Sequence, residues 1–208
     1  MNLEEKWLIV RFNRGDVDAV RMIYERTKGD LMALAVSLLR DTAASEDVVH
    51  DVFASFLKRG NFRQPGSLKG YLSTCVANAA RNLLRANHRH PSDPLEESPA
   101  LKAEGATPDN DVIADEEQRL LSRAVQNLPY EQREVVMLHL RGGLKFAEIA
   151  QSQEVSINTV LGRYRYGLEK IRVELEQFTG PEPGATPRKQ PQERSVSAMP
   201  ATTPEQRP

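Results

Sequence analysis

The chain has 208 residues, of which 39% are hydrophobic and 27% are charged, as in an ordinary globular protein. Its 28 Lys and Arg and 29 Asp and Glu give a formal net charge of −1, so the molecule as a whole lacks the positive charge typical of nucleic-acid binding. The single cysteine, Cys75, excludes an intramolecular disulfide bond, and no apolar segment approaches the roughly 18 residues of a membrane span. Acidic residues near the N-terminus also argue against a signal peptide, so we expect a soluble cytoplasmic protein without membrane insertion.

Residues 1 to about 90 show helical spacing, and no segment alternates with the period of a β-strand. The first amphipathic stripe repeats at three and four residues up to a break at Arg40 and Asp41, and it consists of Val17, Val20, Ile23, Leu31, Leu34 and Leu38. A second helix is expected to follow, with Ser45 as its N-cap. Its predicted buried residues are Val48, Val49, Val52, Phe53, Phe56 and Leu57.

The third predicted helix begins near Leu68 and has a basic side without any acidic residue as far as His90. The polar residues of that side recur at three- and four-residue spacing, and they are Asn78, Arg81, Asn82, Arg85 and Arg89. Single-stranded DNA binds to such surfaces when aromatic rings for stacking lie nearby, and Phe62 in the preceding loop could supply one. Ordinary core packing is the alternative for Phe62 and for Tyr71.

Acidic residues surround the preceding helix instead, and they are Asp41, Glu46, Asp47 and Asp51. They would complement a basic protein surface, although a solvated helix face is the alternative interpretation. The net charge of the whole chain therefore conceals a strong segregation of acidic and basic residues.

Composition changes sharply after this module. Residues 91–111, PSDPLEESPALKAEGATPDND, are rich in Pro, Ser and acidic residues and contain a single basic residue, Lys102. Helical spacing resumes at Val112 and continues to Phe178, and the Pro-rich residues 179–208 are expected to be disordered. We therefore predict an all-α protein with two small helical domains, 1–90 and 112–178, joined by a flexible acidic linker.

The C-terminal domain contains the pattern of a helix-turn-helix. A short helix from about Lys145 to Ser152 precedes a tight turn over residues 153–155, and Ser156 is the expected N-cap of a longer helix. The predicted buried stripe of the longer helix is Ile157, Val160, Tyr164, Leu168, Ile171 and Leu175. Its predicted DNA-facing residues are Ser156, Asn158, Thr159, Arg163 and Arg165. A helical hairpin with a solvated basic face is the alternative.

The segment AVQNLPYEQREVVMLHLRGGLKFAEIA, which leads into this motif, resembles the promoter-binding C-terminal domain of sigma factors, in particular the extracytoplasmic-function (ECF) type of the sigma-70 family. The segment AASEDVVHDVFASFLK resembles the polymerase-binding helix of that family, and GSLKGYLSTCVANAARNLLRANHR resembles its promoter-melting helix. The resemblance covers about residues 10–90 and 115–175. The sequence departs from the family at Glu154, where Gly is usual, and at Leu161, Gly162 and Tyr166, where the family often has polar residues that face DNA.

The resemblance implies that the protein is an RNA polymerase sigma factor. The acidic helix would dock on the clamp of core polymerase, Phe62 and the basic side of the third helix would hold the opened −10 element, and the helix-turn-helix would bind the −35 element as duplex. The linker would pass through the RNA exit region. An anti-sigma factor is a candidate partner, and the free protein is expected to be a monomer.

No sequence pattern indicates an enzyme. The chain has no Gly-rich phosphate loop and no cysteine pair, and its four His residues lack the spacing of a zinc site, so we predict no catalytic residue, metal or cofactor. Two other functions fit the same helices. One is a stand-alone helix-turn-helix regulator whose N-terminal bundle senses a signal or dimerises, and the other is a protein-interaction adaptor.

Overall fold

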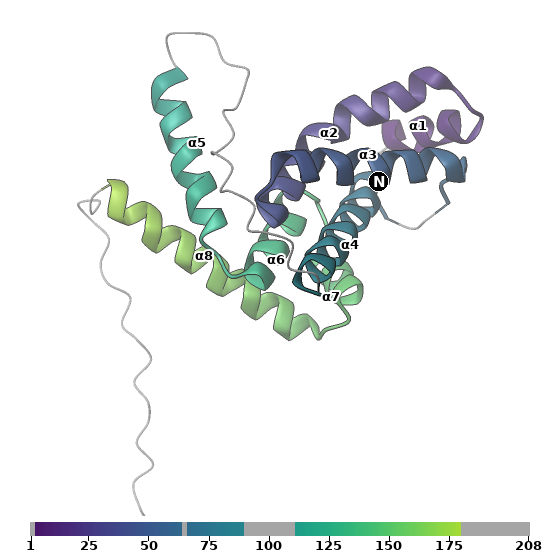
Figure 1. The fold of residues 1–208 in the computed structure, drawn as a ribbon. Helices are drawn as coiled ribbons and strands as arrows, with labels where there is room; N and C mark the ends of the chain where they lie inside the picture. The colour runs from purple at the N-terminus through teal and green to yellow at the C-terminus, as the bar shows by residue number, and fades with distance from the viewer. Residues whose placement is uncertain (1–2, 64–65, 90–110, 180–208) are drawn as a thin grey trace, which may run out of the picture.

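The computed structural model describes residues 3–63, 66–89 and 111–179, and over these residues it consists of helices without a strand. The first four are α1 (Leu3–Asn13), α2 (Val17–Leu39), α3 (Thr42–Arg59) and α4 (Leu68–Arg89). The other four are α5 (Asp111–Gln126), α6 (Tyr130–Leu140), α7 (Phe146–Gln153) and α8 (Ile157–Thr179). This arrangement, shown in Figure 1, confirms the all-α prediction.

Two of the predicted segments cannot be compared with the structure. The expected linker and the expected disordered tail lie outside the described residues, apart from Asp111 and Thr179 at the ends of α5 and α8. None of the helices in the described part of the chain is long and apolar enough to cross a membrane.

The long helix α2 organises the N-terminal half by packing against α1, α3 and α4. Its predicted stripe is buried from Ile23 onward, with Ile23, Leu31, Leu34 and Leu38 at most 2% exposed. Val17, also predicted to belong to the stripe, is 73% exposed because it begins the helix beyond the reach of the core, and that part of the prediction is wrong. On α4, Leu72 and the residues one turn apart from it face the same core. Burial of each such aliphatic side chain stabilises the fold by about 1.5–3 kcal/mol, which explains why the spacing of these residues determines the packing.

The N-cap prediction for the second helix is wrong. Asp41 caps α3, because its Oδ1 accepts a hydrogen bond of 3.0 Å from the amide of Ala44. Ser45 lies fully buried within the first turn, where its hydroxyl donates to the carbonyl oxygen of Asp41. The helix therefore begins one turn earlier than expected. A second prediction for this helix is also wrong, since Leu57, predicted to be buried, is 42% exposed.

The helix α8 also departs from its predicted stripe, since Ile157 is 46% exposed and Leu168 is 38% exposed. Its buried line instead passes through Gly167, which lies against α6. A Cβ atom at Gly167 would be 2.9 Å from Cγ2 of Val136, so only glycine allows the two helices to approach this closely. Because Gly167 is the residue that faces α6, the next residue, Leu168, points partly towards solvent.

The turn between α7 and α8 has the predicted caps. Ser156 Oγ accepts a hydrogen bond of 3.1 Å from the amide of Thr159, which confirms Ser156 as the N-cap. Glu154 adopts the left-handed conformation itself, with φ 56° and ψ 39°, and Val155 donates a hydrogen bond of 3.1 Å to the carbonyl of Ala150. The turn thus keeps its usual geometry although the residue at its left-handed position is not glycine.

The two halves pack against each other, which the sequence did not predict. The helix α6 contacts both α2 and α4, and Val135 and Leu138 of α6 belong to the same core cluster as α2 and α4 residues. In Figure 1, α6 lies beside α4, between the N-terminal helices and the pair formed by α5 and α8. Gly142, just after α6, lies so close to α4 that a Cβ atom there would be 3.0 Å from Cβ of Ser73.

Candidate nucleic-acid interface

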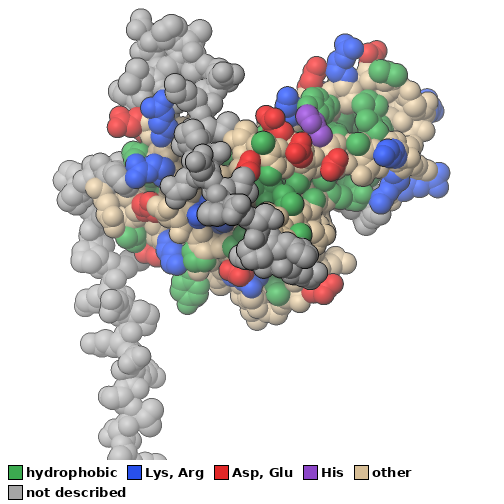
Figure 2. Space-filling model, viewed as in Figure 1, with side chains coloured by type: hydrophobic (Ala, Val, Ile, Leu, Met, Phe, Trp, Pro, Cys, Tyr) green, Lys and Arg blue, Asp and Glu red, His purple; other side chains and the backbone are tan. Residues whose placement is uncertain are grey.

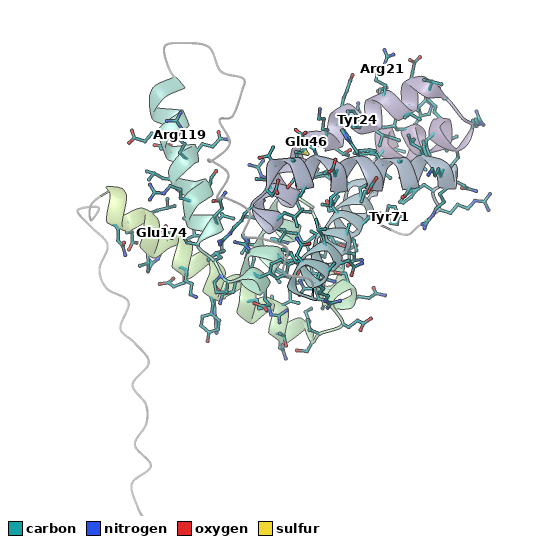
Figure 3. All side chains as sticks on the ribbon, viewed as in Figure 1. Arg21, Tyr24, Glu46, Tyr71, Arg119 and Glu174 are labelled. Carbon is teal, nitrogen blue, oxygen red and sulfur yellow. The ribbon has the colours of Figure 1, made fainter. Side chains whose placement is uncertain are left out.

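The acidic face of α3 is exposed to solvent. Figure 2 shows acidic side chains gathered over this helix, and Figure 3 shows Glu46 near its beginning. Glu46, Asp47 and Asp51 are all exposed and form no ion pair with another described residue. Asp41 differs from them because its carboxylate serves as the N-cap of α3. Three of the four predicted polymerase-binding residues are therefore free to meet a basic surface.

The basic side of α4 is only partly exposed. Asn78, Asn82 and Arg85 are exposed, whereas the side chain of Arg89 lies outside the described residues. Arg81 donates a hydrogen bond of 3.0 Å to Oδ1 of Asn78. The same guanidinium is engaged by the C-terminal half.

An ion pair joins Arg81 to α6. Its Nη2 lies 2.5 Å from Oε1 of Glu134, a residue that is 3% exposed. Burial raises the pKa of the Glu134 carboxyl, and the neighbouring Arg81 opposes that rise. The buried carboxylate thus depends on Arg81 for its compensation, and Arg81 is in turn held away from solvent.

The network extends from Glu134 into α7 and α8. Gln153 donates a hydrogen bond of 2.9 Å from Nε2 to Oε2 of Glu134. Arg163 then donates a hydrogen bond of 3.0 Å to Oε1 of Gln153. One predicted DNA-binding arginine from each half is therefore connected through Glu134 and Gln153. Sequence spacing could not identify these two linking residues, because the halves contact each other only in the folded chain.

Phe62 is packed in the core rather than presented to solvent. It is 4% exposed, and its ring centroid lies 5.2 Å from that of Tyr71 and 6.1 Å from that of Phe56. Asn13 of α1 fixes the backbone here, accepting a hydrogen bond of 2.8 Å from the Phe62 amide and donating one of 3.1 Å to its carbonyl. Stacking of Phe62 on a base would require this loop to rearrange.

The start of α8 presents the remaining predicted residues to solvent. Ser156, Asn158, Thr159 and Arg165 are exposed, and the hydroxyls of Ser156 and Thr159 lie 2.8 Å apart. The guanidinium of Arg165 lies 5.2 Å from the centroid of the Tyr166 ring, which is also exposed. The predicted face is thus brought together on one helix, except that Arg163 is half-buried against Gln153.

The described residues contain no group of three or more His, Cys, Asp and Glu that could hold a metal ion. Cys75 is half-buried, and burial raises the pKa of its thiol, with the Tyr71 hydroxyl and Arg59 acting in the opposite direction. A thiol with a raised pKa is less often present as the nucleophilic thiolate. The Cys75 thiol therefore lacks the lowered pKa of a reactive cysteine.

Two family models match the chain, one in the N-terminal half and one in the C-terminal half. Sigma-70 region 2 matches residues 23–90, which include α3 and α4, and Sigma-70, region 4 matches residues 118–171, from α5 into α8. This chain belongs to the sigma-70 family. The order of the two regions and the ECF factors among its relatives confirm the resemblance to the ECF type that the sequence indicated.

Curated relatives match this sigma factor along most of its length. It is 25% identical to the RNA polymerase sigma-H factor of Pseudomonas aeruginosa over 182 residues, which cover 83% of this chain and 94% of that protein. The ECF RNA polymerase sigma-E factor of Escherichia coli K12 is 26% identical over 180 residues, covering 81% and 93% of the two chains. The RNA polymerase sigma factor CarQ of Myxococcus xanthus is 29% identical over 163 residues, covering 78% and 92%.

A solved structure shares the fold. The sigma factor RpoE of Bartonella quintana, in complex with the anti-sigma factor NepR, superposes with a TM-score of 0.61 at 23% identity, covering 77% of this chain and 98% of that one. At this identity the similarity shows the fold alone.

Proposed function

We propose that this sigma factor binds the core of RNA polymerase and promoter DNA in the cytoplasm and starts transcription without catalysing a reaction of its own. The observation that supports this most is the presence of both sigma-70 regions in one chain, each with an exposed polar face on a helix of that region. The predicted domains, residues 1–90 and 112–178, would each supply one promoter contact.

The −35 element would be bound by the start of α8. Asn158, Thr159 and Arg165 are exposed on the first turns, where a recognition helix enters the major groove. An amide, a hydroxyl and a guanidinium can all donate to base edges or phosphates. This face requires no rearrangement of the described structure to reach DNA.

The −10 element would be held by α4. Asn78, Asn82 and Arg85 are exposed, and Arg81 would join them once its ion pair with Glu134 is broken. Because that ion pair spans the two halves, binding of the opened strand would be coupled to their separation. Phe62 would contribute only after its loop leaves the core.

Core polymerase would bind the acidic face of α3. Replacement of Asp47 by Lys reverses the charge of an exposed residue, so association with core polymerase should weaken while the fold is retained. Glu117→Lys reverses the charge of another exposed residue, on α5, and as the matched control it should leave core affinity unchanged. If Asp47→Lys bound core as tightly as the wild type, α3 would not be the docking helix.

Similarity to a sigma factor solved with NepR supports the proposal of an anti-sigma partner for this chain as well. Pull-down with this protein as bait from the source organism would test it, with a Gly142→Val variant, designed to disturb the packing between halves, for comparison. A partner that recognises the packed halves should be lost in that variant.

Transcription in vitro tests the proposed function directly. Purified protein is added to core polymerase that lacks a sigma factor, on a library of genomic fragments from the source organism. Transcripts that start at discrete sites only when this protein is present would establish the function and identify its promoters. If no transcripts appeared and the protein failed to co-migrate with core, the stand-alone regulator would become the better interpretation.

A further inference from the structure

A cavity of about 720 Å³ lies between the two halves, a volume typical of small-molecule sites. Residues of α2 and α4 form one wall, and residues of α6, α7 and α8 form the other. Its basic lining residues are Arg40, Arg81, Arg85, Arg133 and Arg163, and its acidic ones are Glu131 and Glu134. The cavity therefore has an excess of positive charge.

The two carboxylates do not neutralise most of these arginines. Glu134 is committed to Arg81 and Gln153 by the contacts described above. Glu131 is exposed and forms no ion pair with another residue of the described chain. The guanidinium groups of Arg40, Arg85 and Arg133 likewise have no carboxylate within ion-pair distance among the described residues.

Arg40 and Arg133 donate hydrogen bonds to the same uncharged backbone carbonyl. Nη1 of Arg133 donates a hydrogen bond of 2.8 Å to the carbonyl oxygen of Gln126, and Nη2 of Arg40 donates to the same oxygen. Like charges are thus held side by side at the end of α5. Such an arrangement is unfavourable unless an anion compensates it.

Arg133 also has an unsatisfied donor. The residue is 5% exposed, and its buried Nε has no hydrogen-bond partner among the described residues. A buried charged group with an unpaired donor is costly, so such groups usually indicate a missing partner. Burial, with the repulsion of Arg40, lowers the pKa of Arg133 to about 10, so the group stays protonated at neutral pH, and no carboxylate of the described residues compensates its charge.

We propose that this cavity binds a small phosphorylated anion, with the guanidinium groups of Arg40 and Arg133 as its main ligands and Arg85 beside them. Arginine donates paired N–H groups that match the oxygens of a phosphate. Because both halves line the cavity, the anion would stabilise their packed arrangement and keep α4 against α6.

The depth of Arg133 favours a free anion over a DNA phosphate. Arg133 is only 5% exposed, and a small anion can approach such a residue more closely than the backbone of a duplex can. Arg40 and Arg133 are not among the residues proposed to contact promoter DNA. The inference therefore goes beyond the proposed function and can be tested without polymerase.

Calorimetric titration of the full chain with inorganic tripolyphosphate, at about 0.15 M salt to screen surface charges, tests the proposal. The wild type should bind one anion, and Arg40→Gln and Arg133→Gln should each weaken the affinity at least about tenfold. The matched control is Arg172→Gln, which removes an exposed arginine of α8 that lies outside the cavity and pairs with Glu169. It should bind as the wild type does.

A second measurement guards against misfolding, because Arg133 is buried. Tripolyphosphate should raise the Tm of the wild type and of Arg172→Gln but not that of Arg40→Gln, whose replaced side chain is exposed in the native fold. If Arg133→Gln fails to fold, Arg40→Gln alone decides.

Absence of binding to the wild type, or equal weakening by Arg172→Gln, would overturn the proposal, the latter because it would indicate unspecific attraction. A parallel titration with duplex DNA separates the two sources of phosphate. If Arg40→Gln weakened duplex binding while the wild type ignored tripolyphosphate, the cavity would serve the DNA backbone and the proposal would be wrong.

Discussion

The two proposed promoter contacts differ in how accessible they are. On α8 the polar face lies open, and Asn158, Thr159 and Arg165 need no rearrangement to meet a duplex. On α4 the corresponding face is partly closed, because Arg81 is paired with the buried Glu134 of the other half. If the proposed contacts are correct, the difference teaches that the packed chain presents the α8 face in full, whereas the α4 face would be completed only when the ion pair between Arg81 and Glu134 breaks.

The largest expected effect comes from weakening the contact between the halves. Leu144 is 5% exposed, and its side chain lies beside Gly70 at the start of α4. Leu144→Ala should lower the free energy of unfolding by about 2–4 kcal/mol, because it removes buried methyl groups and leaves a cavity. Urea unfolding measures this, and hydrogen exchange should show faster exchange in α4.

The control for this variant is Leu140→Ala, since Leu140 is 56% exposed on the preceding helix. It should change stability by less than about 0.5 kcal/mol. Equal losses in both variants would contradict the view that Leu144 joins the halves.

A smaller effect is expected on the open face. Arg165→Ala should weaken duplex binding by about 1 kcal/mol and reduce the slope of log K against log salt by about 0.9, if Arg165 neutralises one phosphate. Arg163→Ala should have less effect, because Arg163 is half-buried against Gln153. Fluorescence anisotropy at several salt concentrations, with Lys58→Ala on α3 as the control, measures both. A larger loss for Arg163 would reverse the assignment of the two arginines.

The turn that orients α8 allows a stabilising change. Glu154→Gly should raise the free energy of unfolding by about 0.5–1 kcal/mol, because the left-handed conformation costs a non-glycine residue about 1–2 kcal/mol and glycine loses more entropy on folding. Gln151→Gly, at an exposed position inside α7, should instead lower stability by about 1 kcal/mol. Thermal or urea unfolding distinguishes them, and a destabilised Glu154→Gly would argue against the left-handed turn.

The smallest effect concerns the pH dependence of the closed face. Burial raises the pKa of Glu134, so the folded state binds its proton more tightly than the unfolded state does. Its contribution to stability is therefore complete below the unfolded value of about 4.3 and is lost as the pH rises through the folded pKa. Glu134→Gln should lack this loss when urea unfolding is repeated between acid and neutral pH. An unchanged pH profile in the variant would show that Glu134 is not its source.

Sequence spacing predicted the elements better than it predicted their contacts. The stripe of α2 from Ile23 to Leu38 and the cap at Ser156 are confirmed, because each depends on residues within a few positions of one another. The cap of α3 was mistaken because Asp41 and Ser45 both suit an N-cap and only packing selects between them. The need for glycine at position 167, within α8, is visible only where α6 passes it.

The candidate site shows the same limit. Exposed residues of α3, α4 and α8 could be chosen from charge and spacing, whereas Glu134 and Gln153 could not. Residues 133–138 are all buried in succession, since α6 has neighbours on all sides. A helix surrounded in this way has no polar stripe, so its sequence gives no sign of which side faces which half.

The helix α6 is thus shared by two hydrophobic clusters, which makes it a point of cooperativity. Two domains that were merely tethered would melt one after the other, each at its own temperature. A chain whose halves have one helix in common should instead unfold in a single calorimetric transition, with agreement between the van't Hoff and calorimetric enthalpies.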